Sequence, residues 1–72
     1  MQAARRECLI YLREYVFNQN NENAILYIQM LSEIIGVQQM VFLYLIEDAI
    51  YNENFAVALE HIDYLIDRCA GI

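Results

Sequence analysis

The side chains that could do covalent chemistry are few in this sequence. His61 is the one histidine, Ser32 is the one serine, and the two cysteines, Cys8 and Cys69, lie near opposite ends of the chain. A catalytic triad needs a nucleophile within hydrogen-bonding reach of a histidine. Cys69 follows His61 by eight residues, which is about two turns of one helix and too far for such a bond. Ser32 is expected on a different helix, so we predict that the chain is not an enzyme and has no catalytic residue.

Metal and cofactor sites are not predicted either. A di-iron helical bundle needs a Glu three residues before a His on two of its helices, and here Ala58 holds that position before His61. The carboxylates lack the alternating Asp/Asn-Gly pattern of a calcium loop, and no glycine-rich phosphate loop is present. The row formed by Glu60, Asp63 and Asp67 is therefore interpreted as a solvated acidic face. We expect no cofactor and no metal.

The charge balance is acidic. Ten Asp and Glu stand against four Arg, Lys is missing, and the formal net charge is −6. A surface of this sign repels nucleic acid and anionic lipid, and it suits a basic partner. The cysteine spacing indicates neither a disulfide scaffold nor a zinc site, and the longest apolar run, 40–46, is too short to span a bilayer. We expect a cytoplasmic protein with free thiols that binds neither nucleic acid nor membrane.

The chain carries more apolar side chains than a body of its size can hide. Its 72 residues make a single domain, 1–72, and 60% of them are apolar, above the roughly 45–50% that is typical of globular domains. A domain this small buries only a modest fraction of its surface. We therefore expect an apolar patch on the surface, and large exposed patches usually mark association sites.

Breaker residues and hydrophobic spacing divide the chain into four helices. Pro is missing, Gly36 and Gly71 are the only glycines, and Asn residues cluster at 18–23 and 52–54. Asn favours helix N-caps, and Gly36 fits the left-handed residue that often ends a helix. The fold class is therefore all-α. The predicted helices span about 3–17, 22–35, 38–51 and 54–70.

Three of the predicted helices carry an apolar stripe at helical spacing, and the third is apolar almost all round. The stripes consist of Ala4, Cys8, Tyr11, Leu12, Tyr15 and Val16; of Ala24, Ile25, Ile28, Leu31 and Ile35; and of Phe55, Ala58, Leu59, Ile62, Leu65, Ile66 and Cys69. The third helix is apolar at nearly every position from Val41 to Ile50. A helix of that kind is normally enclosed by neighbours on several sides.

The second half of the sequence is similar to the first when Asn52 is aligned with Asn18, an alignment that we name the repeat register. Identical residues meet at Asn18 and Asn52, Asn20 and Asn54, Ala24 and Ala58, Ile28 and Ile62, and Leu31 and Leu65. The similarity includes a turn as well as an apolar face, which helical periodicity alone would not produce. Self-similarity at this spacing is typical of stacked helix-turn-helix units.

In the repeat register the sequence resembles the tetratricopeptide repeat family, whose unit has the same length as the spacing between Asn18 and Asn52. The two units would span about 5–38 and 39–72. Ala24 and Ala58 match the small residue of the second helix of each unit, and Tyr15 matches the aromatic residue of the first helix. The resemblance implies four antiparallel helices arranged as two stacked hairpins. The alternative is a compact four-helix bundle, in which the first and fourth helices touch.

The surplus of apolar residues favours a non-catalytic interaction module, such as an adaptor, a small chaperone or an inhibitor, that offers an apolar helical surface to a partner protein. In the family that the chain resembles, the first helix of each unit receives the ligand. Tyr is also enriched at interfaces. The candidate partner-binding residues are Ile10, Tyr11, Tyr15, Phe17, Leu26, Met30, Leu43 and Tyr44.

Two other functions compete with this one. The apolar surplus could be covered in a homodimer, which would make the chain a structural, homo-oligomeric helical protein. Alternatively, the acidic row Glu60, Asp63 and Asp67 could imitate nucleic acid and inhibit a nucleic-acid-binding protein. The partner is thus another protein or a second copy of the chain.

Overall fold

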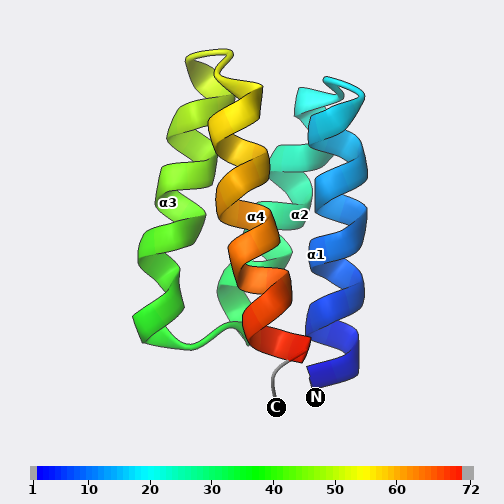
Figure 1. Cartoon of the computed structure of the whole chain (residues 1–72), viewed down its shortest axis with the longest axis vertical. Helices are drawn as coiled ribbons and strands as arrows, with labels where there is room; N and C mark the ends of the chain where they lie inside the picture. Colours follow the sequence, from blue (N-terminus) through cyan, green and yellow to red (C-terminus); the bar gives the residue numbers. More distant parts are fainter. Residues whose placement is uncertain (1, 71–72) are drawn as a thin grey trace.

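The computed structural model describes the backbone of residues 2–70 and the side chains of residues 5–68. It contains four helices, shown in Figure 1, and no strand within residues 2–70. The helices are α1 (Gln2–Phe17), α2 (Asn21–Ile34), α3 (Val37–Tyr51) and α4 (Phe55–Ala70). The predicted all-α class is confirmed, and every predicted helix end lies within one residue of the observed end.

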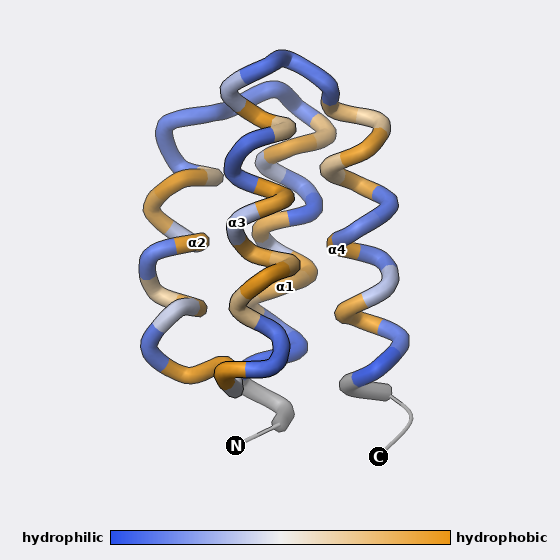
Figure 2. The backbone as a smooth tube through the Cα atoms, turned by 90° about the vertical axis from the view of Figure 1, so that its left-hand side faces the viewer, coloured by the Kyte–Doolittle hydropathy of each residue, from blue (hydrophilic) through white to orange (hydrophobic). Residues whose placement is uncertain are grey.

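Consecutive helices run antiparallel, and together they form a four-helix bundle (Figures 1 and 2). Helix α1 packs along both α2 and α4, and α3 packs along α4, whereas α2 and α3 share a much smaller contact. The order around the bundle is therefore α2, α1, α4, α3. The extensive packing of α1 on α4 is the contact expected of a four-helix bundle. The radius of gyration, 10.8 Å, matches the roughly 11 Å of a compact chain of this length.

The core is a single cluster of apolar side chains from all four helices and the α2–α3 connection. No polar side chain among residues 5–68 is buried. The buried residues are Leu9, Leu12, Val16, Ala24, Ile28, Leu31, Ile35, Leu43, Ile46, Ala49, Ile50, Ala58, Ile62 and Leu65. The stripes predicted for α2 and α4 supply seven of them, and the other described members of these stripes, Ile25, Phe55, Leu59 and Ile66, are partly buried against the core. Ala4 and Cys69, which also fell on predicted stripes, lie outside the described side chains.

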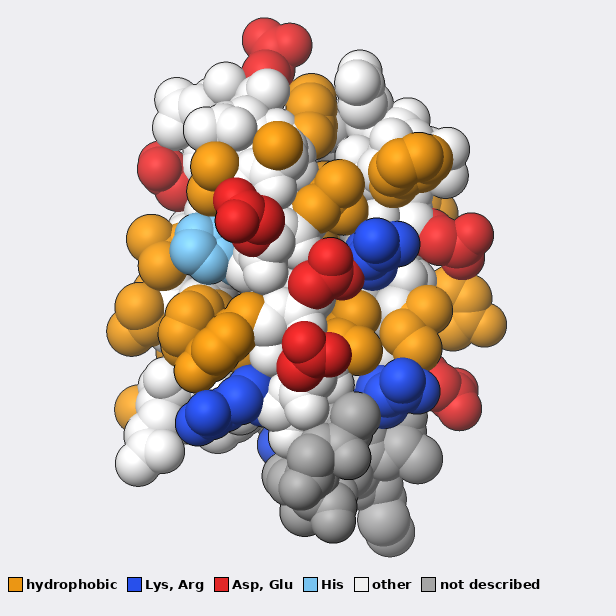
Figure 3. Space-filling view, in the orientation of Figure 1, with side chains coloured by type: hydrophobic (Ala, Val, Ile, Leu, Met, Phe, Trp, Pro, Cys, Tyr) orange, Lys and Arg blue, Asp and Glu red, His pale blue; other side chains and the backbone are white. Residues whose placement is uncertain are grey.

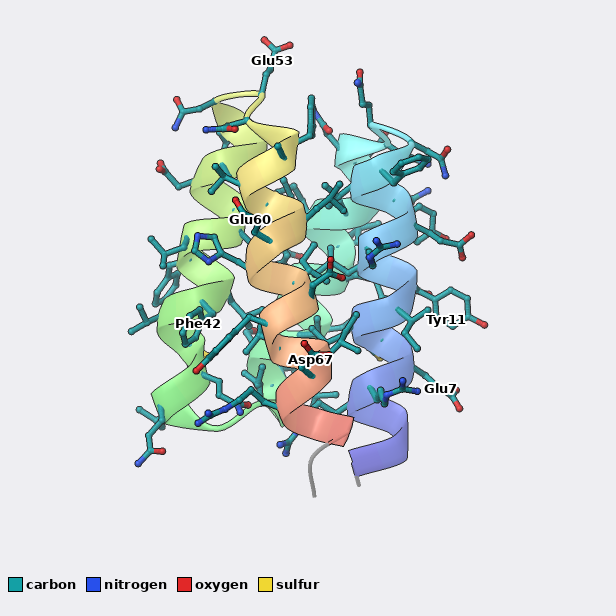
Figure 4. The ribbon with its side chains drawn as sticks, viewed as in Figure 1. Glu7, Tyr11, Phe42, Glu53, Glu60 and Asp67 are labelled. Atoms are coloured by element: carbon teal, nitrogen blue, oxygen red, sulfur yellow. The ribbon has the colours of Figure 1, made fainter. Side chains whose placement is uncertain are left out.

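The stripe predicted for the first helix is confirmed in part, because Leu12 and Val16 are buried and Cys8 and Tyr15 pack against the core. Leu9, which was not part of it, is completely buried, whereas Tyr11 is 49% exposed. Because α1 packs against two helices, its buried face is centred on the line through Leu9, Leu12 and Val16. The tyrosines of α1 lie instead at the edge facing α2, where the Tyr15 and Tyr27 ring centroids are 5.3 Å apart. Figure 4 shows Tyr11 pointing away from the bundle.

The expectation that the third helix is enclosed on several sides is wrong. In a ring of four helices each helix has only two neighbours, so a helix that is apolar all round leaves one face uncovered. On α3 that face carries large exposed side chains, among them Val37, Val41 and Tyr44. Figure 2 looks onto α3, with α2 on one side of it and α4 on the other.

The two turns that connect α1 to α2 and α3 to α4 have the same geometry. Each contains a residue in the left-handed region, Gln19 with φ 58° and Glu53 with φ 57°. The following residue donates its N–H to the carbonyl oxygen five residues earlier, as in the Schellman motif. These bonds run from Asn20 N to Tyr15 O and from Asn54 N to Ala49 O, each at 2.8 Å. The two bonds occupy equivalent positions in the repeat register.

The predictions for the Asn and Gly residues are confirmed only in part. Asn20 is the N-cap residue of α2, but its side chain makes no capping bond. The side chains of Asn18 and Asn52 donate to the Glu14 and Asp48 carbonyl oxygens, which also accept the backbone N–H of the same asparagine. Gly36 has φ −71° and precedes α3 in an extended conformation. The left-handed residues are thus Gln19 and Glu53 rather than Gly36.

Candidate binding groove between two helices

The bundle has two seams between its hairpins, the α1–α4 seam and the α2–α3 seam. The repeat register aligns α1 with α3 and α2 with α4, so these two seams are counterparts of each other. The α1–α4 seam is closed by extensive helix packing, whereas the helices of the α2–α3 seam contact each other far less. The second seam therefore leaves a space along the surface.

That space is a groove of about 220 Å³, which we name the α2–α3 groove. It is lined by Ile28, Gln29 and Ser32 of α2 and by Met40, Leu43, Tyr44 and Glu47 of α3. Its volume is below the roughly 300–1,000 Å³ that is usual for small-molecule pockets. The groove is therefore smaller than a usual small-molecule site.

An exposed apolar stripe continues the groove on the α3 side. Val37 is 87% exposed, Val41 58% and Tyr44 62%. Their spacing, i, i+4 and i+7, places them on one face of the helix. Met40 and Leu43 lie beside this stripe and line the groove itself. The groove and the stripe together form one apolar surface along α3.

Glu47 is the one charged residue that lines the groove. It is half-buried, and among the described side chains it forms neither an ion pair nor a hydrogen bond. The other polar groups are Gln29 and Ser32, and the Ser32 hydroxyl donates to the Gln29 carbonyl oxygen at 2.6 Å. A carboxylate therefore lies in an otherwise neutral and mainly apolar groove.

The closed seam places different side chains at the corresponding positions. There the guanidinium Nε of Arg13 donates to a carboxylate oxygen of Asp63 at 2.6 Å. In the repeat register Arg13 corresponds to Glu47, and Asp63 corresponds to Gln29. The open seam therefore has no positively charged side chain at these two positions. The half-buried Ile66, which packs against the core, corresponds to Ser32. The open seam thus lacks both the ion pair and one apolar side chain.

The structure does not bring all the predicted partner-binding residues together. Tyr44 and Leu43 line the groove, but Leu43, which was predicted to contact a partner, is only 2% exposed and belongs to the core. Tyr15 is half-buried against α2. The others are exposed on α1 or α2 outside the groove: Ile10, Tyr11, Phe17, Leu26 and Met30. Since α1 and α3 are not packed against each other, Tyr11 and Tyr44 do not share one face.

Sequence reasoning missed most of the groove. Four of the lining residues were not among the candidates: Gln29, Ser32, Met40 and Glu47. They line a groove only because α2 and α3 are poorly packed against each other, and the sequence does not show this. One signal was available in the sequence. A helix that is apolar all round in a chain too short to surround it should expose a face. Val37 and Val41 could have been found in this way.

The predicted acidic row lies on the outer face of α4 (Figures 3 and 4). Glu60, Asp63 and Asp67 are all exposed, as expected of a solvated face. Asp63 is held by Arg13, so one of the three carboxylates is already neutralised within the chain. The hypothesis that this row imitates nucleic acid stays a prediction.

Within residues 5–68, the residues considered for covalent chemistry, His61, Ser32 and Cys8, share no hydrogen bond with one another. His61 is half-buried and lies beside Phe42, with ring centroids 6.1 Å apart; Figure 4 shows Phe42 on the side of α3 that faces α4. Cys8 is a free, half-buried thiol on α1. Across residues 5–68, no three His, Cys, Asp or Glu side chains converge in a way that could hold a metal ion.

Tyrosines from α1 and α2 cluster where these two helices meet, with the Tyr15 and Tyr27 ring centroids 5.3 Å apart and those of Tyr11 and Tyr27 6.0 Å apart. Burial raises the pKa of the Tyr27 hydroxyl above its ordinary value, and the neighbouring Tyr15, Cys8 and Tyr11 raise it further. The phenol therefore stays protonated and neutral at ordinary pH. This cluster packs α1 and α2 together.

No protein-family model, curated protein or solved structure matches this chain. Within the described part of the chain, none of the helices has the length and hydropathy needed to cross a membrane.

Proposed function

We propose that this chain is a non-catalytic protein-interaction module that receives a helix of another protein in the α2–α3 groove. The observation that carries the proposal is the open seam. The groove is mainly apolar and continues into the exposed stripe of Val37, Val41 and Tyr44. An apolar surface of this kind on a small domain is typical of an association site.

A helix is the occupant that fits the shape best. The groove lies between two helices, and a third helix laid along them would pack its ridges into the space that they leave. A partner with apolar residues at i, i+3 or i+4, and i+7 would match the stripe on α3. This is the helix-in-groove mode of recognition.

The energy available indicates a modest affinity. Full burial of a large apolar side chain contributes about 1.5–3 kcal/mol, and Val41 and Tyr44 are already partly buried. Association must also overcome the loss of translational and rotational freedom. We expect dissociation constants in the micromolar range or weaker, which suits an adaptor, a small chaperone or a reversible inhibitor. A reducing cytoplasm fits the free thiol of Cys8.

A designed peptide tests the proposal without knowledge of the natural partner. The probe is a capped helix of about 18 residues, long enough to be partly helical in water, with Leu at i, i+3, i+4 and i+7. Titration into the labelled protein, followed by backbone amide shifts, should perturb residues of α2 and α3 that border the groove. Shifts confined to other helices, or no shifts, would contradict it.

A matched pair of variants locates the site. Tyr44→Ala removes an exposed ring from the groove, and Tyr11→Ala removes an exposed ring from α1. Both replacements leave good helix formers in place. Tyr44→Ala should weaken the peptide, whereas Tyr11→Ala should not. A concentration-dependent dimer in sedimentation, with its interface on α3, would favour the homo-oligomeric alternative instead.

A further inference from the structure

We infer that the α2–α3 groove selects a cationic amphipathic helix, whose Arg or Lys pairs with Glu47. The inference rests on the proposed function and adds the chemistry of the partner to it. Glu47 then acts as a specificity-determining residue, while the apolar residues of the groove supply most of the affinity.

The position of Glu47 is the first support. It lies among Leu43, Tyr44 and Met40 on the α3 side of the groove, where any docked helix would cover it. Within residues 5–68 it has no cationic partner. The carboxylate is half-buried already, so a docked helix removes much of the water that still solvates it.

That loss of water decides which helices are accepted. An ionised carboxylate that is covered without a partner is strongly destabilised. A purely apolar helix would fill the groove and leave Glu47 in this state, and an acidic helix would add repulsion. A helix that brings a guanidinium or ammonium to Glu47 replaces the lost water with a charge-assisted hydrogen bond. Selection therefore works partly by rejecting the wrong helices.

At the closed seam, the charged residue in the corresponding position has a partner of opposite charge. Arg13, the counterpart of Glu47, is paired across the seam with Asp63 at 2.6 Å. At the open seam the residue across from Glu47 is Gln29, which is neutral. The missing charge is a cation, and a partner helix inserted between α2 and α3 would have to supply it.

A second copy of this chain is a poor source of that cation. Each copy carries a net charge of −6 and only four Arg residues. Three of them already have contacts within the chain: Arg5 donates to the Ile34 carbonyl oxygen, Arg13 pairs with Asp63, and Arg68 lies over the Tyr64 ring. Two acidic copies would also repel each other. The charge complementarity therefore points to a different, basic protein.

Three families of peptides test the inference. They share the Leu stripe described above, and each carries one Arg, one Gln or one Glu, placed in turn at the positions that flank the stripe. For at least one position, the Arg peptide should bind the wild-type protein about threefold to tenfold more tightly than the Gln peptide, as expected of a partly desolvated ion pair. The Glu peptide should bind most weakly.

Variants of the protein assign the preference to one side chain. Glu47→Gln should remove the advantage of the Arg peptide without abolishing binding, and Glu47→Arg should reverse the order so that the Glu peptide binds best. The matched control is Glu14→Gln, which makes the same change of charge at an exposed position of α1. It should leave the preference intact.

The outcomes separate the inference from the proposed function. If no peptide shifts the amides of α2 and α3, the proposed function fails. If all three peptides bind in the groove with equal affinity, or if Glu47→Gln leaves the Arg advantage unchanged, the proposed function stands and the charge selection is overturned. A self-associated protein whose α2–α3 groove no peptide can enter would also overturn it, in favour of a second copy.

Discussion

The α1–α4 seam and the α2–α3 seam are formed by corresponding helices, but the helices pack closely only at the first seam. Their helices correspond in the repeat register, and the turns beside them share the same hydrogen bonds and left-handed residues. Yet the first seam is closed and the second leaves a groove. The backbone turns do not explain this difference, so its cause must lie in the side chains along the helices.

Few side chains differ in a way that matters. Ile66 of α4 packs against the core, whereas its counterpart in the repeat register, Ser32, is small and polar and lines the groove. Arg13 and Asp63 form an ion pair, while Glu47 and Gln29 do not. An apolar side chain contributes more to helix contact than an exposed ion pair does. We therefore attribute the open seam chiefly to Ser32.

The largest effect should come from the core leucines of the two seams. Leu9 and Leu43 are counterparts, and both are buried. Removing a leucine side chain from a core costs about 2–5 kcal/mol, with the larger losses where the surroundings collapse least. Leu9→Ala should therefore cost about 3–4 kcal/mol and Leu43→Ala about 2–3 kcal/mol, because Leu43 borders a groove into which neighbours and water can move. Urea unfolding measures both.

The comparison of the two leucines is controlled by a pair that does not line the groove. Leu31→Ala and Leu65→Ala make the same change at counterpart buried positions of α2 and α4, so their costs, each about 2–5 kcal/mol, should be similar. If Leu43→Ala proves as costly as Leu9→Ala, the region around Leu43 is packed as rigidly as the closed seam, and the structural contrast drawn above is wrong.

A smaller effect should follow from exchanging the residues that distinguish the seams. Ile66→Ser should lower the free energy of unfolding by about 1–2 kcal/mol, because it removes a half-buried apolar side chain. Ser32→Ile should raise it by about 0.5 kcal/mol by filling the groove, and it should weaken the designed Leu peptide. Thermal and urea unfolding give the first two values. A Ser32→Ile protein that binds the peptide as well as wild type would show that the groove is not the docking site.

Glycine substitutions in the two turns should change the free energy of unfolding by equal amounts, because the turns have the same geometry in both halves of the chain. Gln19 and Glu53 are non-glycine residues in the left-handed region, where an ordinary residue loses about 1 kcal/mol or more relative to Gly. Gln19→Gly and Glu53→Gly should each stabilise the protein by about 0.5–1 kcal/mol after the entropy of the unfolded Gly is included. Asn52→Gly is the control; its φ is −90°, so it should destabilise.

The sequence was sufficient to predict the helices and their ends. The Asn clusters, the lack of Pro and the apolar stripes indicated four helices to within one residue. The identities found in the repeat register reappear as two turns with identical hydrogen bonds. These features are local, or they repeat a local pattern, and local patterns are what helical periodicity and turn chemistry encode.

The arrangement of the helices could not be predicted in the same way. Which face of α1 is buried depends on its packing against both α2 and α4, so the predicted stripe omitted the buried Leu9 and included the exposed Tyr11. The groove depends on the unequal closure of two seams, which involves residues such as Ser32 and Glu47 that look like ordinary surface positions in the sequence. A pairwise helix contact is a property of two segments at once, and no single stripe specifies it.

The smallest effect should come from the ion pair. Arg13→Gln should cost at most about 0.5 kcal/mol, since exposed ion pairs contribute little, and the loss should shrink further at high salt. The double variant Gln29→Asp with Glu47→Arg transplants the pair to the open seam. If packing closes the seam, the transplant should stabilise by no more than about 0.5 kcal/mol, with the groove still able to bind a Leu peptide. The contrary result would be a double variant that is stabilised by more than about 1.5 kcal/mol and no longer binds the peptide. That gain is larger than an exposed ion pair supplies. Charge rather than Ser32 would then explain why the two seams differ.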